Sequence, residues 1–339
     1  MMQLIRPTVL SAATPSGSLT LGNYLGAIKN WISLNENYET FFMVADLHSL
    51  TVKENAENLS EKTLSFVAQY VALGLDPNKN CIFLQSQIPE HSELTWILSC
   101  VTPLGNLQRM TQFKDKSSKQ KSILSGLLLY PVLMSADILL YQAKYVPVGE
   151  DQLQHLELCR DIVEYFHHSY LKTENQNNPI FTIPNPLVQK TGARIMSLTN
   201  PEQKMSKSDP DPFSFIGLLD DLSMVEKKIK KAVTDSGSQI IYSPENKAIA
   251  NLMTIYSCLT GNSFEEIEKK FIGKLYGHFK LELAERVCEF LRPVQVRYSE
   301  LMKDKSELFR ILNEGSLIAR KRASETLGRV KEAVGLLHI

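Results

Sequence analysis

Short apolar runs alternate with amphipathic stretches over the first 90 residues of the chain. The apolar runs Val9–Ala13, Phe41–Ala45 and Cys81–Gln85 have the length and the residue types of buried strands. Between them, residues 22–35 and 56–73 carry apolar side chains at helical spacing. Strands that alternate with helices predict an α/β fold with a parallel, doubly wound sheet of the Rossmann type. Such sheets bind ligands beyond the carboxyl ends of their strands.

The middle of the chain, from residue 90 to about residue 168, has a mostly helical pattern. Its most apolar stretch, Leu127–Tyr141, is interrupted only by Ser135 and Asp137, which predicts a helix buried in a core or in an oligomer interface. Strand-like runs return at Val146–Val148, Ile180–Ile183 and Arg194–Leu198. We therefore expect the sheet to be split by a helical insertion at about residues 103–170.

The pattern changes again near residue 213, after a turn that contains Pro210 and Pro212. Beyond this turn, helical patterns cover residues 221–233, 245–259, 263–272, 279–302 and 305–336. We expect two domains, an α/β domain over residues 1–212 and a helical domain over residues 213–339, with the last helix packing back on the first domain.

Charge and cysteine usage narrow the function classes only in part. Lys and Arg number 37, as do Asp and Glu, so the net charge is zero and any RNA-binding surface has to be local. None of the five cysteines belongs to a C-x-x-C pair, which indicates free thiols in a reducing cytoplasm and no protein-held metal. We expect no membrane partner, because no apolar run approaches the length that spans a bilayer.

Two segments have the composition of a phosphate-binding site. Residues 15–24, Pro-Ser-Gly-Ser-Leu-Thr-Leu-Gly-Asn-Tyr, follow the first predicted strand and lead into a helix whose free N–H groups favour anions. Within them, Gly22 would let a phosphate approach the backbone without a Cβ in the way. Residues 204–208, Lys-Met-Ser-Lys-Ser, place two lysines in one short loop. Either segment alone is most often a solvated turn.

In this order and separation, the two segments resemble the nucleotide-binding signatures of the class I aminoacyl-tRNA synthetases. Thr20-Leu21-Gly22-Asn23 stands where that class usually carries His-Ile-Gly-His, and the Thr-x-Gly-Asn form is similar to the tryptophanyl branch. The resemblance implies a ligase that activates L-tryptophan with ATP and Mg²⁺ and transfers it to tRNA(Trp). It also implies a homodimer with a catalytic α/β domain and an anticodon-binding helical domain.

The reaction implied by the resemblance joins a carboxylate to the α-phosphate of ATP. It needs no general base and depends on positioning and on stabilising negative charge. Lys116, Lys204 and Lys207 would stabilise the triphosphate and the transition state. Thr20 and Asn23 would position the phosphates or Mg²⁺. The resemblance implies ATP binding by Thr14, Pro15, Ser16, Gly22, Asn23, Gly149, Glu150, Asp151, Ile195, Lys204, Met205, Ser206, Lys207 and Ser208.

A second set of residues is implied for a tryptophan pocket. Asp137 would accept the indole N–H, since indole offers one donor and no acceptor; the alternative is an Asp paired with a neighbouring helix or an Arg. Gln152 would orient the amine, and Tyr130 would contact the amine or the carboxylate. The implied set is Asp137, Tyr130, Met134, Gln152, His48, Leu10 and Val148. By itself, His48 is equally compatible with a structural histidine.

Other functions stay open on the residues alone. They are tyrosyl activation, a different nucleotidyltransferase of the same fold, and a catalytically silent paralogue that binds RNA or senses tryptophan. The Asp137 and Gln152 segments argue against the first, and the intact Lys204 and Lys207 argue against the last. The cluster Lys227-Lys228-Ile229-Lys230-Lys231 is either a contact to a tRNA backbone or a solvated helix face.

Overall fold

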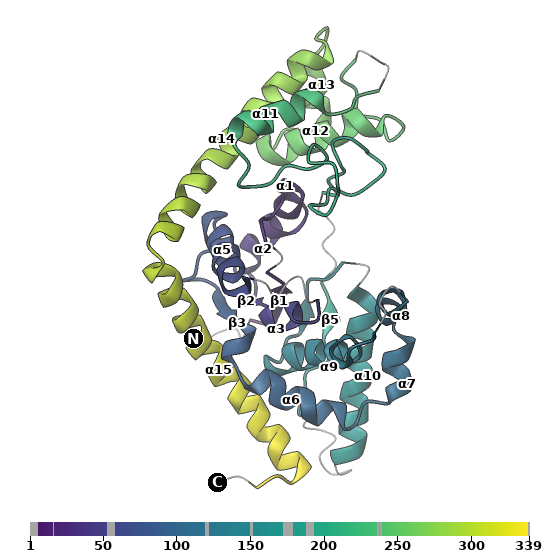
Figure 1. Ribbon diagram of the computed structural model, residues 1–339, viewed down its shortest axis with the longest axis vertical. Helices are drawn as coiled ribbons and strands as arrows, with labels where there is room; N and C mark the ends of the chain where they lie inside the picture. Colours follow the sequence, from purple (N-terminus) through teal and green to yellow (C-terminus); the bar gives the residue numbers. More distant parts are fainter. Residues whose placement is uncertain are drawn as a thin grey trace.

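The structure is a computed structural model that describes residues 6–15, 17–52, 58–118, 122–149, 152–171, 179–187, 193–235, 237 and 239–337. Within these residues, a parallel sheet of five strands has the order β3-β2-β1-β4-β5. The strands are β1 (Thr8–Ala13), β2 (Glu39–Val44), β3 (Cys81–Leu84), β4 (Tyr145–Val146) and β5 (Asn185–Pro186). Helices cover both faces of this sheet (Figure 1). The predicted doubly wound α/β fold is therefore confirmed.

The central strand of the sheet is β1. Val9 pairs with Thr40 of β2 on one side and with Tyr145 of β4 on the other, both in parallel. The chain builds β2 and β3 on one side of β1 and then crosses to build β4 and β5 on the other. A crevice opens at such a switch point, beyond the carboxyl ends of the strands. Because β1 ends at Ala13, the small-residue segment 15–24 begins at this crevice.

One face of the sheet is covered by the helices that follow β1 and β2. They are α1 (Leu21–Asn23), a π-helical turn (Tyr24–Ile28), α2 (Lys29–Leu34) and α5 (Leu59–Ala72). Leu21 and Ile28 share one hydrophobic core with Phe66 of α5 and Phe42 of β2. The apolar spacing that predicted two helices in this part of the chain is thus the spacing of side chains that face the sheet.

Short helices and the helical insertion lie around the rest of the sheet. They are α3 (Asp46–Ser49), a 3₁₀ turn (Gln85–Gln87), α6 (Glu90–Ser99), α7 (Leu104–Arg109), α8 (Thr111–Ser117), α9 (Ser125–Leu140) and α10 (Leu153–Tyr170). A second hydrophobic core joins Val132 and Ala136 of α9 to Leu10 and Phe41 of the sheet. The expectation of a buried apolar helix is therefore confirmed, with Asp137 inside it.

The last third of the chain is helical. It contains α11 (Leu222–Lys231), α12 (Lys247–Thr260), α13 (Phe264–Lys270), α14 (Tyr276–Lys303) and α15 (Ser306–Val334). The long helices α14 and α15 run one after the other along one edge of the molecule (Figure 1). Gly315 lets α15 touch β3, because a Cβ there would lie 1.9 Å from the carbonyl oxygen of Ile82. Arg322 of α15 also contacts Glu39 of β2 at 2.9 Å.

Two of the strands expected from apolar runs are wrong. Residues 180–183 form no strand; Ile180 and Phe181 are instead buried in the second core, and β5 follows them at Asn185–Pro186. Residues 194–198 make only a single antiparallel bridge, between Met196 and Lys204. Here Asn251 of α12 occupies both backbone groups of Met196, at 2.8 and 2.9 Å, where a neighbouring strand would bind. An apolar run therefore marked burial rather than sheet pairing.

Two further properties concern the described part of the chain as a whole. None of its helices has the length and apolar character that crossing a membrane requires. Its His, Cys, Asp and Glu side chains form no group of three or more that could hold a metal ion. All five cysteines are free.

Candidate active site

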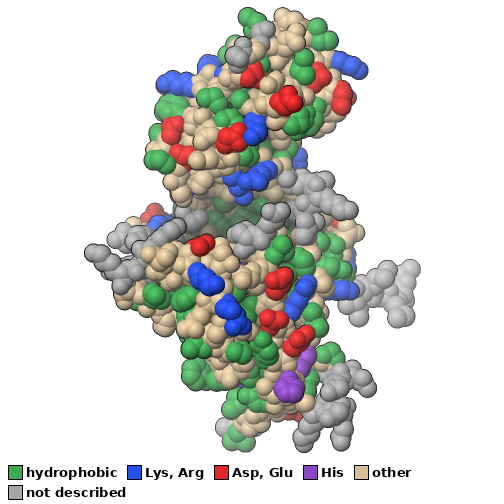
Figure 2. Space-filling model, turned by 90° about the vertical axis from the view of Figure 1, so that its right-hand side faces the viewer, with side chains coloured by type: hydrophobic (Ala, Val, Ile, Leu, Met, Phe, Trp, Pro, Cys, Tyr) green, Lys and Arg blue, Asp and Glu red, His purple; other side chains and the backbone are tan. Residues whose placement is uncertain are grey.

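Two adjoining cavities open at the carboxyl end of β1. The first has a volume of about 540 Å³ and the second a volume of about 620 Å³. Ala12, Ala13 and Thr14, at and just after the end of β1, border both cavities, as does Gln152 at the start of α10. Figure 2 shows the hollow between the upper helical part and the lower part of the molecule, with Lys and Arg side chains beside it. A ligand in one cavity would therefore meet a ligand in the other next to Thr14 and Gln152.

The first cavity collects the whole residue set that was expected for tryptophan. Its wall contains Leu10, His48, Tyr130, Met134, Asp137, Val148 and Gln152. These side chains come from β1, α3, α9 and the segment between β4 and α10, so four separate parts of the chain meet here. Lys116 and Gly149, which were expected at the ATP, also border this first cavity.

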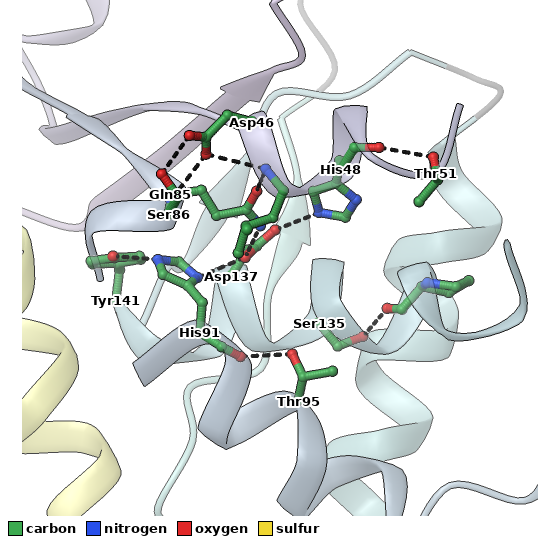
Figure 3. A network of polar contacts seen from close by, with 12 residues as sticks. Asp46, His48, Thr51, Gln85, Ser86, His91, Thr95, Ser135, Asp137 and Tyr141 are labelled. Carbon is green, nitrogen blue, oxygen red and sulfur yellow. Dashed lines mark hydrogen bonds and ion pairs between the residues drawn. The ribbon is translucent and has the colours of Figure 1, made fainter. Parts of the chain in front are cut away.

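Asp137 is the charged centre of this wall, although it is only 2% exposed. Its Oδ1 accepts hydrogen bonds from Nε2 of Gln85 at 2.8 Å and from Nδ1 of His91 at 2.7 Å. Its Oδ2 accepts one from Nε2 of His48 at 2.8 Å. The three donors converge on the carboxylate from different elements (Figure 3).

These donors decide the charge of the buried carboxyl group. Burial disfavours the charged form, but the hydrogen bonds from His48 and His91 outweigh it and lower the pKa of Asp137 to about 2. Asp137 is therefore ionised near neutral pH and accepts hydrogen bonds without donating any. Of the alternative interpretation, an Asp paired with a neighbouring helix or an Arg, the structure shows the first part: His91 of α6 and His48 of α3 pair with Asp137.

The sequence alone did not single out three members of this group, namely Gln85, His91 and Tyr141. Gln85 and His91 are fully buried, and His91 Nε2 lies 2.8 Å from the Tyr141 hydroxyl. The available signal was weak. Gln85 directly follows the apolar residues of β3, where polar residues of parallel sheets face the crevice, but nothing local marks His91 as a partner of a residue 46 positions away.

Tyr130 is held at the edge of the same cavity. Its hydroxyl lies 2.7 Å from Nε2 of His155, and burial raises the pKa of Tyr130 to about 12. The ammonium of Lys116 lies 5.4 Å from the centre of the Tyr130 ring, a cation–π contact. In this arrangement Lys116, the last basic residue of α8, lies on the first cavity rather than on the second.

The second cavity collects half of the residues that were expected to bind ATP, together with Thr20. Its wall contains Thr14, Thr20, Asn23, Lys204, Met205, Ser206, Lys207 and Ser208. Thr20 and Asn23 form the cap of α1: Oδ1 of Asn23 accepts from the Thr20 N–H at 2.8 Å, and Oγ1 of Thr20 accepts from the Asn23 N–H at 3.1 Å. These reciprocal bonds fix both side chains at the start of the helical stretch.

The lysine loop, residues 204–208, packs directly on the small-residue segment. A Cβ at Gly17 would lie 2.4 Å from Nζ of Lys207, so the absence of a side chain makes room for this ammonium. Met205 is the buried residue of the loop and fills the space that a Cβ would take at Gly22. The missing side chain at Gly22 thus makes room for Met205 of the lysine loop.

Apart from Gly149, the other residues that were expected to bind ATP either border neither cavity or lie outside the described residues. Pro15, Gly22 and Ile195 do not border either cavity. Ile195 is 1% exposed, and its carbonyl oxygen accepts the N–H of Met205 at 3.0 Å. Ser16, Glu150 and Asp151 lie outside the described residues.

The basic cluster on α11 contains one residue that is not at the surface. Lys228 is 4% exposed; its ammonium contacts Oδ2 of Asp220 at 2.6 Å and the carbonyl oxygen of Phe215 at 2.9 Å. Asp220 also accepts the N–H of Gly217, which forms a bridge with Thr20. Lys228 therefore belongs to the support of the second cavity, while the three other lysines of the cluster remain exposed.

Comparison with known proteins agrees with this geometry. Residues 4–292 match the family described as tRNA synthetases class I (W and Y). The chain is 49% identical to a tryptophan–tRNA ligase of Halalkalibacterium halodurans and 48% identical to one of Bacillus subtilis, in each case over 98% of both chains. The tryptophanyl-tRNA synthetase of Campylobacter jejuni, solved with ADP and tryptophan, is 36% identical and superimposes with a TM-score of 0.84 over 97% of this chain and 100% of its own. The family match over residues 4–292 and the relatives that span almost the whole chain show that this protein belongs to the class I tRNA synthetases for tryptophan and tyrosine.

Proposed function

We propose that this protein is a tryptophan–tRNA ligase, which activates L-tryptophan with ATP to tryptophanyl-adenylate and transfers the tryptophan to tRNA(Trp). The observation that carries the proposal is the contact between the two cavities at Thr14 and Gln152. One cavity has apolar walls and a buried carboxylate, and the other has two lysines and a capped helix start. A tryptophan in the first would present its carboxylate to the α-phosphate of an ATP in the second.

The chemistry of the first step fits the second cavity. An amino-acid carboxylate is itself the nucleophile, so the protein has to position the reactants and stabilise the charge on the pyrophosphate that leaves. Lys204 and Lys207 supply positive charge on an exposed loop, and Thr20 and Asn23 supply fixed polar groups at the helix start. Lys116 would contribute to the triphosphate only after moving from its place over Tyr130.

Selection of the amino acid would depend on Asp137. A carboxylate offers about four acceptor positions, and three hydrogen bonds reach Asp137 from the protein. An indole N–H in the cavity would supply the fourth. An amino acid without this donor would leave an acceptor of a buried charge unpaired, which is the arrangement that gives strong discrimination.

Mg²⁺ would enter with the nucleotide. The residues fit this role only in part, because the described chain has no cluster of three acidic or histidine ligands. Magnesium commonly keeps several waters and binds through substrate phosphates, with few protein ligands. The ion would add positive charge at the phosphates. The side chains of Thr20 and Asn23 would orient the phosphates that carry it.

A homodimer is part of the proposal and is supported by exposed apolar side chains on the helical insertion and on α6, the helix that precedes it. Trp96 of α6 is 72% exposed, and Leu104 of α7 and Leu129 of α9 are also exposed. Both α6 and α7 pack on α9. Large apolar side chains at a surface commonly mark a site of protein association. Sedimentation velocity would test it, with Trp96→Glu expected to shift the species towards the monomer.

The helical domain over residues 213–339 would bind the anticodon of tRNA(Trp), and the domain over residues 1–212 would carry the chemistry. The exposed Lys227, Lys230 and Lys231 of α11 support a contact to a phosphate backbone. A cytoplasmic location fits both the free cysteines and the tRNA substrate.

The first experiment is ATP–pyrophosphate exchange without tRNA, with each amino acid supplied separately. We expect exchange with tryptophan alone. Exchange with tyrosine would overturn the specificity but keep the class of reaction. A folded protein that supports no exchange with any amino acid would refute the proposed function and favour a silent paralogue or another nucleotidyltransferase.

A further inference from the structure

Two polar side chains lie behind Asp137, away from the cavity. His91 and Tyr141 are both fully buried, and neither borders the first cavity. His91 links them, with Nδ1 2.7 Å from Oδ1 of Asp137 and Nε2 2.8 Å from the Tyr141 hydroxyl (Figure 3). A buried polar group costs stability unless its hydrogen bonds are satisfied, so this chain of contacts needs a physical account.

The positions of the hydrogens in this chain follow from chemistry. Asp137 is ionised and only accepts, so Nδ1 of His91 must carry the hydrogen that it donates. In the tautomer with this hydrogen on Nδ1, Nε2 of His91 is the acceptor that faces the Tyr141 hydroxyl. Tyr141 donates to it, since burial raises the pKa of Tyr141 well above its usual value and keeps its hydroxyl protonated. The direction of donation is therefore Tyr141 to His91 to Asp137.

This chain of donors determines which acceptor position of Asp137 remains for a ligand. Oδ1 has two acceptor positions and receives two hydrogen bonds, from His91 and Gln85. Oδ2 receives one, from His48, which itself borders the cavity. The remaining acceptor position is thus on Oδ2, the oxygen on the same side as a cavity residue.

The rings behind Asp137 are held rigidly by the core. The His91 ring stacks on Phe83, with centroids 6.3 Å apart and an angle of 23° between the planes. The Tyr141 ring packs against Phe41, with centroids 5.0 Å apart. Phe83 and Tyr141 hold the His91 ring in place, so its hydrogen bond to Oδ1 opposes rotation of the carboxylate about its Cβ–Cγ bond. Without His91, only the amide of Gln85 would hold Oδ1.

We propose that His91 is a positioning residue for amino-acid selection: it fixes the orientation of the Asp137 carboxylate so that the open acceptor position of Oδ2 faces the indole N–H of tryptophan. The inference rests on the proposed function of the first cavity. His91 touches no substrate atom, and it acts only through Asp137. It is expected to affect the recognition of the indole N–H much more than the chemical step.

The test compares tryptophan with benzothienylalanine, in which sulfur replaces the indole N–H at nearly the same shape. ATP–pyrophosphate exchange gives kcat/KM for each amino acid, and the ratio of the two values reports the N–H contact. The ratio is measured for the wild type, for His91→Leu, which removes the donor, and for His91→Asn, whose Nδ2 occupies nearly the position of Nδ1. Thermal unfolding of each variant is the control for folding. The KM for ATP is the control for the second cavity, which His91 does not border.

We expect His91→Leu to lower the ratio by about tenfold or more, as the loss of a hydrogen bond to a charged group does. The KM for tryptophan should rise while kcat changes little, and His91→Asn should restore most of the ratio. A His91→Leu enzyme that keeps the wild-type ratio would overturn the inference, as would an Asn variant that is no better than Leu. If His91→Leu fails to fold, the comparison of the wild type with His91→Asn still tests the inference. A folded His91→Asn enzyme that no longer prefers tryptophan over benzothienylalanine would contradict the role of Nδ1. If the wild type shows no exchange with tryptophan, the proposed function has failed instead.

Discussion

The contact between α15 and the sheet offers a sharp test of how the last helix is held. Gly315 lies where α15 crosses β3, and a Cβ at this position would be 1.9 Å from the carbonyl oxygen, 2.7 Å from the carbonyl carbon and 3.2 Å from the nitrogen of Ile82. All three are backbone atoms of the edge strand β3, so no side-chain rotation can relieve the overlap. Gly315→Ala therefore requires α15 to move away from β3 by about 1 Å.

The cost of this movement can be bounded from the contacts that it disturbs. Overpacking a core by one methyl group typically costs about 1–3 kcal/mol, and a backbone obstacle places this site at the upper end. The movement also weakens the packing of Ala319 and Ala323, which are fully buried in the second core, and the bond from the Cys81 thiol to the Gly315 carbonyl oxygen. Alanine itself favours a helix over glycine by roughly 0.5–1 kcal/mol, which offsets part of the loss. We expect a net loss of about 2 kcal/mol in the free energy of unfolding.

Gly277 of α14 provides the matched control, because a Cβ there would have no atom within 4 Å. Gly277→Ala should leave stability unchanged or raise it by about 0.5 kcal/mol. Urea unfolding of both variants and the wild type, at one protein concentration because association stabilises the folded state, gives the comparison. Equal midpoints for Gly315→Ala and Gly277→Ala would refute the reasoning that backbone contact at Ile82 holds α15 in place.

Three further results are expected. The pKa of Asp137, about 2, lies below its value in the unfolded chain, so the stability that its charged form contributes is present above about pH 4 and is lost as the pH falls through 2. In urea unfolding over this pH range, the wild type should lose about 2 kcal/mol more of its free energy of unfolding than Asp137→Asn. Parallel pH dependences of the two proteins would contradict this expectation. Lys228→Met should cost about 3 kcal/mol by leaving Asp220 without its ion pair, whereas Lys227→Met should change stability by less than about 0.5 kcal/mol in the same assay. Lys207→Ala should slow ATP–pyrophosphate exchange by about a hundredfold while tryptophan binding, followed by fluorescence, stays within about twofold; equal losses of both would place Lys207 in folding rather than in chemistry.

Local patterns predicted the elements well where one side of an element faces the core. The helices expected at 221–233 and 245–259 are found at Leu222–Lys231 and Lys247–Thr260. The same kind of pattern misled at residues 180–183, where Ile180 and Phe181 are buried without belonging to a strand. Apolar residues report burial, whereas strand pairing depends on whether a neighbouring backbone is present to bind.

The lysines of α11 illustrate the same limit for a charged cluster. In the sequence, nothing distinguishes the four lysines of residues 227–231 from one another. The cluster had two interpretations, a contact to tRNA or a solvated helix face. In the structure, the turn before α11 brings Asp220 to Lys228 alone, while Lys227 points to solvent. The side chain that is buried depends on an ion-pair partner from a preceding turn, which no local spacing reveals.

The alternation of strands with helices, the small-residue and lysine segments and the apolar helix around Asp137 could be derived from the chain itself, because periodicity and turn chemistry act over a few neighbouring residues. The surroundings of Asp137 could not. His48, Gln85 and His91 reach it from three other elements, and only the packing of α6 and α9 against the sheet brings them together. The tertiary structure therefore decided that this aspartate is charged, how it is oriented and which acceptor it presents to the cavity, because hydrogen bonds to a buried group depend on distances in space and not on distances along the chain.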